Sequence, residues 1–205
     1  MCGRPNNPET VIAVVMAAGL GSRMGQPKAQ LPWPDGGNLM GLAIRRARVW
    51  SGAVAAVVPP QLADQVPKWA LAVVNAQPEL GLSASFRVAF EALSDAKWTA
   101  AAFVLVDQPF VNVEDGRRMM AQWVDRGLAT RASRPFYDGV PGHPVVVSRD
   151  LWAELLPELH GDHGLGPLLD GRRDLQIVAV AVGDRPNPAL DIDDEDDYLA
   201  ALTRV

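Results

Sequence analysis

The sequence predicts an α/β fold, a three-layer sandwich with a mostly parallel, Rossmann-like central sheet. Four apolar runs have the length of buried strands: Val11 to Val15, Ala53 to Val58, Leu71 to Asn75 and Ala100 to Val106. Segments with helical spacing lie between these runs. A helix between two strands returns the chain to the end of the sheet at which the first strand began. The next strand then runs in the same direction, so this order indicates parallel pairing.

Three helices are expected among these strands. Apolar residues recur at helical spacing from Leu39 to Trp50, with arginines on the opposite face, which is typical of a helix covering a sheet. A short helix over Gln61 to Ala70 is broken near Pro67. Ser83 can cap a third helix, whose apolar face carries Phe86, Ala89, Phe90 and Leu93.

The second half of the chain continues the alternation, and turn residues mark its boundaries. We expect, in order, a helix over Val113 to Gly127, a strand over Leu128 to Ser133, a hairpin over 134–147, a helix starting at Ser148, a strand over Asp174 to Val182 and a short helix ending at Leu202.

Composition favours one globular unit in a reducing compartment. A chain of 205 residues buries roughly 70% of the surface that it exposes when unfolded. We expect residues 1–10 to form a flexible leader and residues 11–205 a single domain. The net charge of -5 argues against a nucleic-acid partner, which normally meets a basic stripe. One cysteine, and no apolar run approaching about 18 residues, indicate a soluble, cytoplasmic protein with no membrane partner.

The strand that starts at Val11 leads into a glycine-rich loop with two cations. Small residues and glycines let the backbone approach a ligand and turn with positive φ, so that successive N–H groups point at an anion. Arg23 and Lys28 can then neutralise the bound charge. The residues of this predicted phosphate loop are Ala17, Ala18, Gly19, Gly21, Arg23, Gly25 and Lys28.

Two common phosphate loops do not fit this stretch. A Walker loop needs Gly-Lys followed by Ser or Thr, but Lys28 lies between Pro27 and Ala29. The dinucleotide fingerprint fails because its third glycine position is Met24 and the next strand ends without an acidic residue for a ribose.

Carboxylates mark two further places. Asp107 directly follows an apolar strand, and in an open parallel sheet the ligand lies beyond such strand ends. A carboxylate beside a triphosphate is how proteins hold Mg²⁺, although Asp107 can also cap the next helix. In the acidic run from Asp191 to Asp197, a helix dipole explains the last four acids but not Asp191 or Asp193.

The glycine loop resembles the signature of nucleotidyltransferases with a GT-A-like fold, roughly L-A-A-G-x-G-x-R-M-G-x-x-K, with Met16 in place of leucine. The resemblance implies that the loop wraps the triphosphate of an NTP. It also implies that Arg23 and Lys28 hold phosphate oxygens, and that Ala17 and Ala18 border the base.

Two other segments extend the resemblance. The stretch from Gln77 to Phe86 is similar to N-P-x-x-x-G-x-x-x-S-L, which implies that Gly81 and Ser85 lie beside the base or ribose. The acidic run resembles D-I-D-T-P-E-D-L, with Asp194-Glu195 replacing Thr-Pro. This pattern implies that Asp193 joins Asp107 as a metal ligand.

The acceptor side resembles the molybdenum cofactor cytidylyltransferase group, which also carries Asp-Gln-Pro at its metal site. The segment around Gly142-His143-Pro144 implies acceptor contacts from Gly142 and His143, although a lone histidine before a strand is often structural. The family pattern Gly-Asp-x-Gly-Ala-Arg implies a further contact from Asp162. Leu165-Gly166 replaces its Ala-Arg, which removes an expected anion contact and puts the acceptor's identity in question.

Together these resemblances imply a Mg²⁺-dependent nucleotidyltransferase with Lys28, Arg23 and Asp107 as catalytic residues. The acceptor's phosphate attacks the α-phosphorus of CTP, and pyrophosphate leaves. The implied acceptor is a phosphorylated pterin, molybdopterin or the molybdenum cofactor, and the implied protein partner is a molybdoenzyme or its chaperone. Two alternatives remain: a GTP-using guanylyltransferase of the molybdopterin guanine dinucleotide type, and a relative that binds nucleotide or cofactor without turnover.

Overall fold

The computed structural model describes residues 10–21, 24–35 and 37–205, so most of the expected leader and the predicted phosphate ligand Arg23 lie outside the described residues. Its centre is an eight-stranded sheet in the order β10-β7-β9-β6-β1-β4-β5, with β8 paired to β7. The strands are β1 (Val11–Met16), β4 (Ala53–Val58), β5 (Leu71–Val74), β6 (Ala100–Leu105), β7 (Ala132–Tyr137), β8 (Val140–Pro141), β9 (Val145–Ser148) and β10 (Leu175–Val180).

The pairing is mostly parallel. Strand β1 runs parallel to β4 on one side and to β6 on the other, and β10 runs parallel to β7. Strand β9 is antiparallel to both β6 and β7. A small separate sheet joins β2 (Pro32–Trp33) to β3 (Gly37–Asn38). The central sheet confirms the predicted α/β class.

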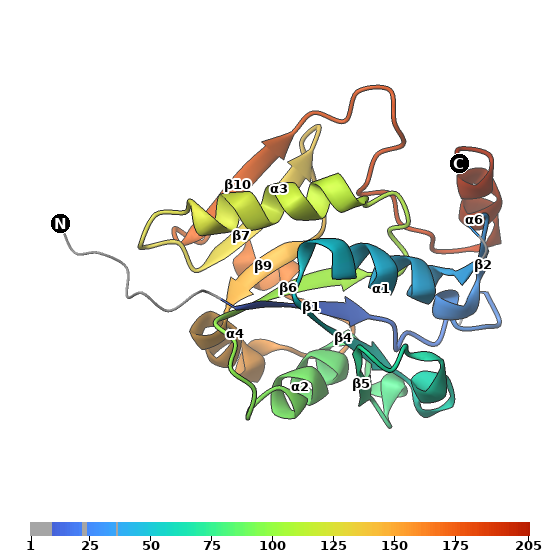
Figure 1. Cartoon of the computed structure of the whole chain (residues 1–205), viewed down its shortest axis with the longest axis horizontal. Helices are drawn as coiled ribbons and strands as arrows, with labels where there is room; N and C mark the ends of the chain where they lie inside the picture. Colours follow the sequence, from blue (N-terminus) through green and yellow to red (C-terminus); the bar gives the residue numbers. More distant parts are fainter. Residues whose placement is uncertain (1–9, 22–23, 36) are drawn as a thin grey trace.

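Helices cover both faces of the sheet, which makes three layers (Figure 1). One face packs against α1 (Leu39–Trp50) and α3 (Val113–Val124), and the other against α2 (Leu82–Ala92) and α4 (Arg149–Leu155). None of the helices in the described part of the chain is long and apolar enough to cross a membrane. The shorter helical segments are α5 (Gly166–Leu169), α6 (Glu195–Leu202) and the 3-10 turns η1 (Lys28–Gln30), η2 (Pro60–Gln65), η3 (Pro78–Leu80) and η4 (Leu156–Glu158).

Strand β7 differs most from the prediction. It begins at Ala132 and runs through the segment expected to be a turn, as far as Tyr137. Pro135 lies inside this strand, and its carbonyl accepts a hydrogen bond from the Gly142 N–H at 3.0 Å. The turn of the predicted hairpin is two residues long, and both Asp138 and Gly139 have positive φ.

Two helix boundaries also differ from the prediction. Helix α2 begins at Leu82 with Gly81 at its N-cap, so Ser83 lies within the first turn, where its N–H donates to the carbonyl of Gly161 at 3.0 Å. The helix expected over Gln61 to Ala70 is only the 3-10 turn η2, which ends before Pro67.

Long-range contacts gather three distant segments at the carboxyl ends of β1 and β6. The register places Met16 at the end of β1 opposite Leu105 at the end of β6. The Ile192 N–H donates to the carbonyl of Asp107 at 2.8 Å, which fixes the acidic C-terminal segment there. Figure 1 shows α6 at this same end of the sheet.

Upstream, both terminal nitrogens of Arg185 bind the buried carboxylate of Asp115, at 2.6 and 2.8 Å. This ion pair anchors the chain that leads from β10 to the acidic segment.

The packing of α1 on α3 leaves no room for a side chain at Gly116. A Cβ there would lie 2.1 Å from the Trp50 Nε1. We predict that Gly116→Ala lowers the free energy of unfolding by about 1–2 kcal/mol, because overpacking costs more than the gain in helix propensity. Urea denaturation measures the change. The exposed Gly127, whose nearest neighbour would be 3.9 Å away, is the control. Equal stabilities of Gly116→Ala and Gly127→Ala would contradict this packing.

Candidate active site

A cleft of about 600 Å³ opens beyond the carboxyl ends of β1 and β6. The loop after β1, the segment that leads into α2 and the end of β6 form its walls. A second hollow, between α1 and β6, has a volume of only about 10 Å³ and is too small for a nucleotide. The cleft is lined by Met16, Ala18, Gly19, Leu20, Gly21, Lys28, Pro78, Glu79, Gly81, Leu82, Ser85, Leu105, Val106, Asp107, Asp162 and Asp193.

Lys28 joins two carboxylates in this cleft. Its Nζ lies 3.2 Å from Asp107 Oδ2 and 2.8 Å from Asp193 Oδ1. Burial acts to lower the pKa of Lys28, but the two carboxylates outweigh it and raise that pKa. Lys28 therefore stays an ammonium ion and offsets the repulsion between the two acids.

The backbone of the glycine loop holds Lys28 in place. Gly21 has a φ of +61°, and a Cβ on it would lie 2.1 Å from the carbonyl oxygen of Gln26. Only glycine fits such a position. The chain can therefore turn sharply at Gly21, and the 3-10 turn η1 begins at Lys28.

Asp107 has one oxygen available for a further ligand. Its Oδ1 is buried and has no hydrogen-bond partner among the described residues. Burial raises the pKa of Asp107, and Lys28 acts in the opposite direction. A buried carboxylate oxygen without a donor is costly unless it binds something, and a cation is the natural partner.

The donor set suits a divalent ion that also binds phosphates. Within the described ranges, no group of three or more His, Cys, Asp or Glu side chains is arranged to hold a metal ion. The chain therefore offers two carboxylates, Asp107 and Asp193. Mg²⁺ is usually held by one or two carboxylates, with phosphate and water completing its shell, so this arrangement fits.

The predicted nucleotide-side residues lie together, with one exception. Ala18, Gly19, Gly21, Gly81 and Ser85 all line the cleft. Ala17 does not border it, because strand alternation turns its side chain into the core on the opposite face, with Ala13 and Val15.

Gly81 brings the two sides of the cleft into contact. Its φ is +88°, and a Cβ on it would lie 2.5 Å from the carbonyl carbon of Gly161 and 2.6 Å from Asp162 Oδ1. Asp162, predicted as an acceptor contact, therefore lies on the side of Gly81 rather than beside His143.

The sequence prediction missed Asn75, which supports Ser85. The Asn75 side chain is buried, and its Nδ2 donates to the Ser85 hydroxyl at 3.0 Å. Its Oδ1 accepts from the Gln77 N–H at 3.0 Å. A polar residue directly after an apolar strand was the available signal.

His143 contacts the site through Gln108. Its Nδ1 lies 2.9 Å from Gln108 Oε1, and the Gln108 amide nitrogen donates to Asp191 Oδ1, also at 2.9 Å. Because the amide nitrogen faces the carboxylate, the amide oxygen accepts, and the proton of His143 is assigned to Nδ1. The ring then presents a bare Nε2. Burial, with a smaller effect of Arg134, lowers the pKa of His143 to about 3.

Gly142 has a packing role beside this histidine. A Cβ on Gly142 would lie 2.6 Å from the ring of Tyr137. The Tyr137 hydroxyl in turn donates to the carbonyl oxygen of His143 at 2.7 Å. The three predicted acceptor residues, Gly142, His143 and Asp162, therefore lie in two places rather than one.

The segments that build this cleft belong to a known family. Residues 13–178 match the MobA-like NTP transferase domain. This chain belongs to the MobA-like NTP transferase family. It is therefore a nucleotidyltransferase, as the glycine loop predicted.

Two curated relatives of this MobA-like protein carry different names. A probable molybdenum cofactor guanylyltransferase from Rhodopirellula baltica is 31% identical over 120 residues, a match that spans 57% of this chain and only 57% of the relative. A molybdenum cofactor cytidylyltransferase from Escherichia coli is 26% identical over 197 residues, covering 93% of this chain and 95% of the relative.

Solved structures show the same fold. Rv0371c from Mycobacterium tuberculosis is similar with a TM-score of 0.78 and 30% identity, over 96% of this chain and all 100% of that one. It has also been solved as a complex with manganese, which gives a TM-score of 0.76. A nucleotidyl transferase from Methanothermobacter, at 24% identity over 95% of this chain and 96% of its own, shares the fold with a TM-score of 0.71.

Substituting Gly81 tests the shape of the cleft. We predict that Gly81→Ala weakens NTP binding about tenfold or more, because the new methyl group pushes Gly161 and Asp162 outward. Gly139 has nearly the same φ, +87°, with no atom within 4 Å of its Cβ position, so Gly139→Ala is the matched control. Calorimetric titration with NTP measures both. Equal affinities would show that the contact at Gly81 does not shape the cleft.

The low pKa of His143 should make stability depend on pH. The unfolded chain takes up a proton at this histidine below about pH 6.5, whereas the native protein does so only near its pKa of about 3. The free energy of unfolding should therefore fall by up to about 1.4 kcal/mol per pH unit as the pH drops through this window. Urea denaturation at several pH values should show His143→Gln losing this slope and the exposed control His160→Gln keeping it. The same slope in both variants would contradict the assignment.

Proposed function

We propose that this chain transfers CMP from CTP to a phosphorylated pterin acceptor, molybdopterin or the molybdenum cofactor, and releases pyrophosphate. The observation that carries the proposal is the convergence of Lys28, Asp107 and Asp193 at the mouth of a nucleotide-sized cleft. A cation held between two acids beside a glycine loop suits a polyphosphate with a divalent ion.

The reaction needs positioning and charge neutralisation more than it needs a covalent nucleophile. An oxygen of the acceptor's phosphate forms a bond to the α-phosphorus of the nucleotide. The bond between that phosphorus and the bridging β-oxygen breaks, and pyrophosphate takes the electron pair. Lys28 is placed to neutralise charge that develops on the phosphates, and Arg23 has the same proposed role.

Asp107 and Asp193 are the residues that would hold Mg²⁺. Bound there, the ion would supply Lewis acidity and offset the charge of the triphosphate. The unpartnered Oδ1 of Asp107 supports this role. On the nucleotide side, Gly81 and Ser85 are proposed to contact the base or ribose, and the backbone of Gly19 and Gly21 to bind phosphate oxygens.

Cytidylyl transfer is favoured over guanylyl transfer because the cytidylyltransferase relative aligns with more of this chain. The cytidylyltransferase relative aligns along 93% of the chain, and the Asp107-Gln108-Pro109 sequence resembles that group. Guanylyl transfer is the second candidate, because the guanylyltransferase relative has the higher identity, 31%. Either product would pass to a molybdoenzyme or its chaperone in the cytoplasm.

Pyrophosphate release separates these possibilities. Purified protein is incubated with Mg²⁺ and each NTP in turn, with and without molybdopterin. We expect release with CTP only when the acceptor is present. Release with GTP alone among the nucleotides would replace the proposal with the guanylyl alternative. The absence of release with every nucleotide, despite measurable NTP binding, would favour a binding protein without turnover.

Asp107 is the residue whose loss should affect turnover most. We predict that Asp107→Ala lowers kcat at least about a hundredfold while the protein stays folded, because the departing phosphate loses charge stabilisation. Asp95 is exposed and is not among the residues that line the cleft, so Asp95→Ala is the control. Steady-state pyrophosphate release and circular dichroism measure activity and folding. Wild-type turnover in Asp107→Ala would remove this residue from the metal site.

A further inference from the structure

The sheet face that carries Met16 and Ala18 of the nucleotide cleft also extends across β6 and β9 to β7. Ala101, Val147 and Ala132 lie side by side on β6, β9 and β7, and all three belong to the core on the α2 and α4 face. Because strand side chains alternate, Arg134, two residues after Ala132, emerges on this same face. Met16 and Ala18, which line the cleft, lie on it too.

Arg134 has unused hydrogen-bonding capacity. Only 12% of its side chain is exposed, and within the described ranges its one carboxylate partner is the exposed Asp170, at 3.1 Å from Nη1. Its Nε is buried with no acceptor among the described residues. A guanidinium has five N–H donors, so this one keeps several of them for a ligand.

The surroundings of Arg134 keep space for its guanidinium. A Cβ on Gly166 would lie 3.3 Å from Nη2, so a larger residue at that position would displace the group. The guanidinium also lies over the ring of Phe136, at 6.0 Å from its centroid. Its charge reaches the ring of His143, because it contributes to lowering the pKa of that histidine.

We infer that Arg134, on β7, binds the acceptor through its phosphate, of the phosphomonoester class. This inference rests on the proposed function, and it assigns the acceptor-side anion contact to β7. Arginine suits the task because its planar donors match phosphate oxygens. His143, linked to Gln108 between the two cations, would then face the acceptor with its bare Nε2.

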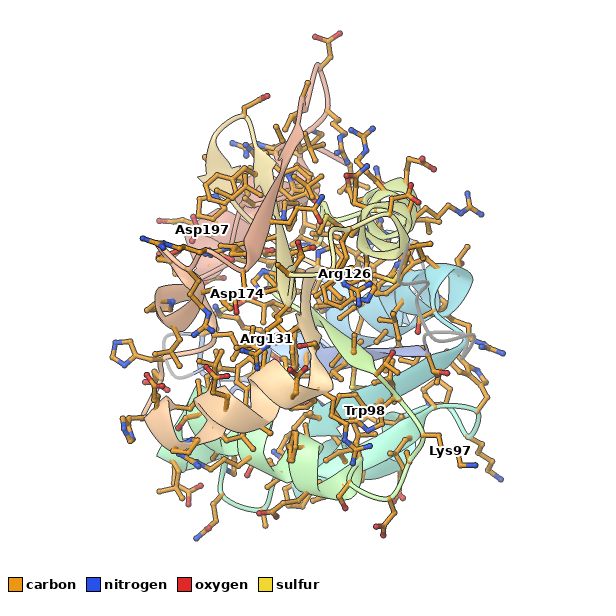
Figure 2. The ribbon with its side chains drawn as sticks, turned by 90° about the vertical axis from the view of Figure 1, so that its left-hand side faces the viewer. Lys97, Trp98, Arg126, Arg131, Asp174 and Asp197 are labelled. Carbon is orange, nitrogen blue, oxygen red and sulfur yellow. The ribbon has the colours of Figure 1, made fainter. Side chains whose placement is uncertain are left out.

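Another arginine shows what a purely structural role looks like in this molecule. Arg131, just before β7, contacts three carboxylates, those of Asp150, Glu154 and Asp174, at 3.0, 2.8 and 3.6 Å. Figure 2 shows Arg131 and Asp174 close together. Arg131 is thus surrounded by acids, whereas Arg134 has one exposed acid and a buried free donor. Arg131→Gln is therefore the matched control.

The first test is kinetic. Arg134→Gln should raise KM for the acceptor at least about tenfold and leave KM for CTP unchanged, since a charge-assisted contact of this kind is worth about one order of magnitude or more. Arg131→Gln should change neither constant. Wild-type KM for the acceptor in a folded Arg134→Gln protein would overturn the inference.

The second test does not need turnover, so it separates failure of this inference from failure of the proposed function. Inorganic phosphate is titrated by calorimetry into Lys28→Ala, which lacks one of the two cations proposed for the nucleotide side. We expect phosphate to bind still, and the affinity to fall about tenfold or more in Lys28→Ala/Arg134→Gln but not in Lys28→Ala/Arg131→Gln. Equal affinities in the two double variants, or no binding to Lys28→Ala, would overturn the inference.

A variant at Asp170 tests the role of Arg134 if Arg134→Gln does not fold. Asp170→Asn removes the acid that competes for the guanidinium but keeps the guanidinium itself. The double variant Lys28→Ala/Asp170→Asn should bind phosphate at least as tightly as Lys28→Ala alone. Weaker phosphate binding in Asp170→Asn would show that Arg134 is there to hold α5 in place, and would contradict a ligand-binding role.

Discussion

The ammonium of Lys28, held between the carboxylates of Asp107 and Asp193, is the interaction on which the site depends. The two partners are 79 and 165 residues away in the sequence, so the contact exists only when most of the chain is folded. Two acids this close repel each other, and the lysine offsets that repulsion while no other cation is present. When a triphosphate binds with a divalent ion, the ion can bind the two carboxylates and the phosphates can bind the ammonium of Lys28.

The rest of the fold can be understood as what brings those three groups together. Parallel pairing of β1 and β6 puts the glycine loop beside Asp107. The bond from the Ile192 N–H to the Asp107 carbonyl, and the pairing of Arg185 with Asp115, bring the acidic segment back from the far edge of the sheet. The opposite wall depends on the contact between Gly81 and Gly161, which leaves no room for a side chain. Each contact is tight and specific, whereas the cleft between them stays open.

The sequence predicted those parts of the site whose chemistry is local. A strand that ends in glycines and a lysine, or in a lone aspartate, identifies Gly19, Lys28 and Asp107 without knowledge of the fold. Asp193 depended on a family resemblance, because its position before the helix separates it and Asp191 from the acids of the helix but does not indicate what either of them binds. Asn75, Gln108 and Arg134 were missed because their roles come from partners far along the chain. Ser83 was wrongly expected to cap α2, because the helix begins earlier than expected, at Leu82, and the N–H of Ser83 in its first turn is bound by the distant Gly161. The end of β7 was misplaced because Pro135 is a turn signal that this strand accommodates.

The most direct test of the central claim is anomalous scattering from Mn²⁺ in crystals of the chain grown with a non-hydrolysable CTP analogue. The account predicts a manganese peak in contact with the carboxylates of Asp107 and Asp193, with the Lys28 ammonium moved onto the phosphates. A peak at any other group of residues, or nucleotide density in the cleft with Lys28 still bound to both acids, would contradict it.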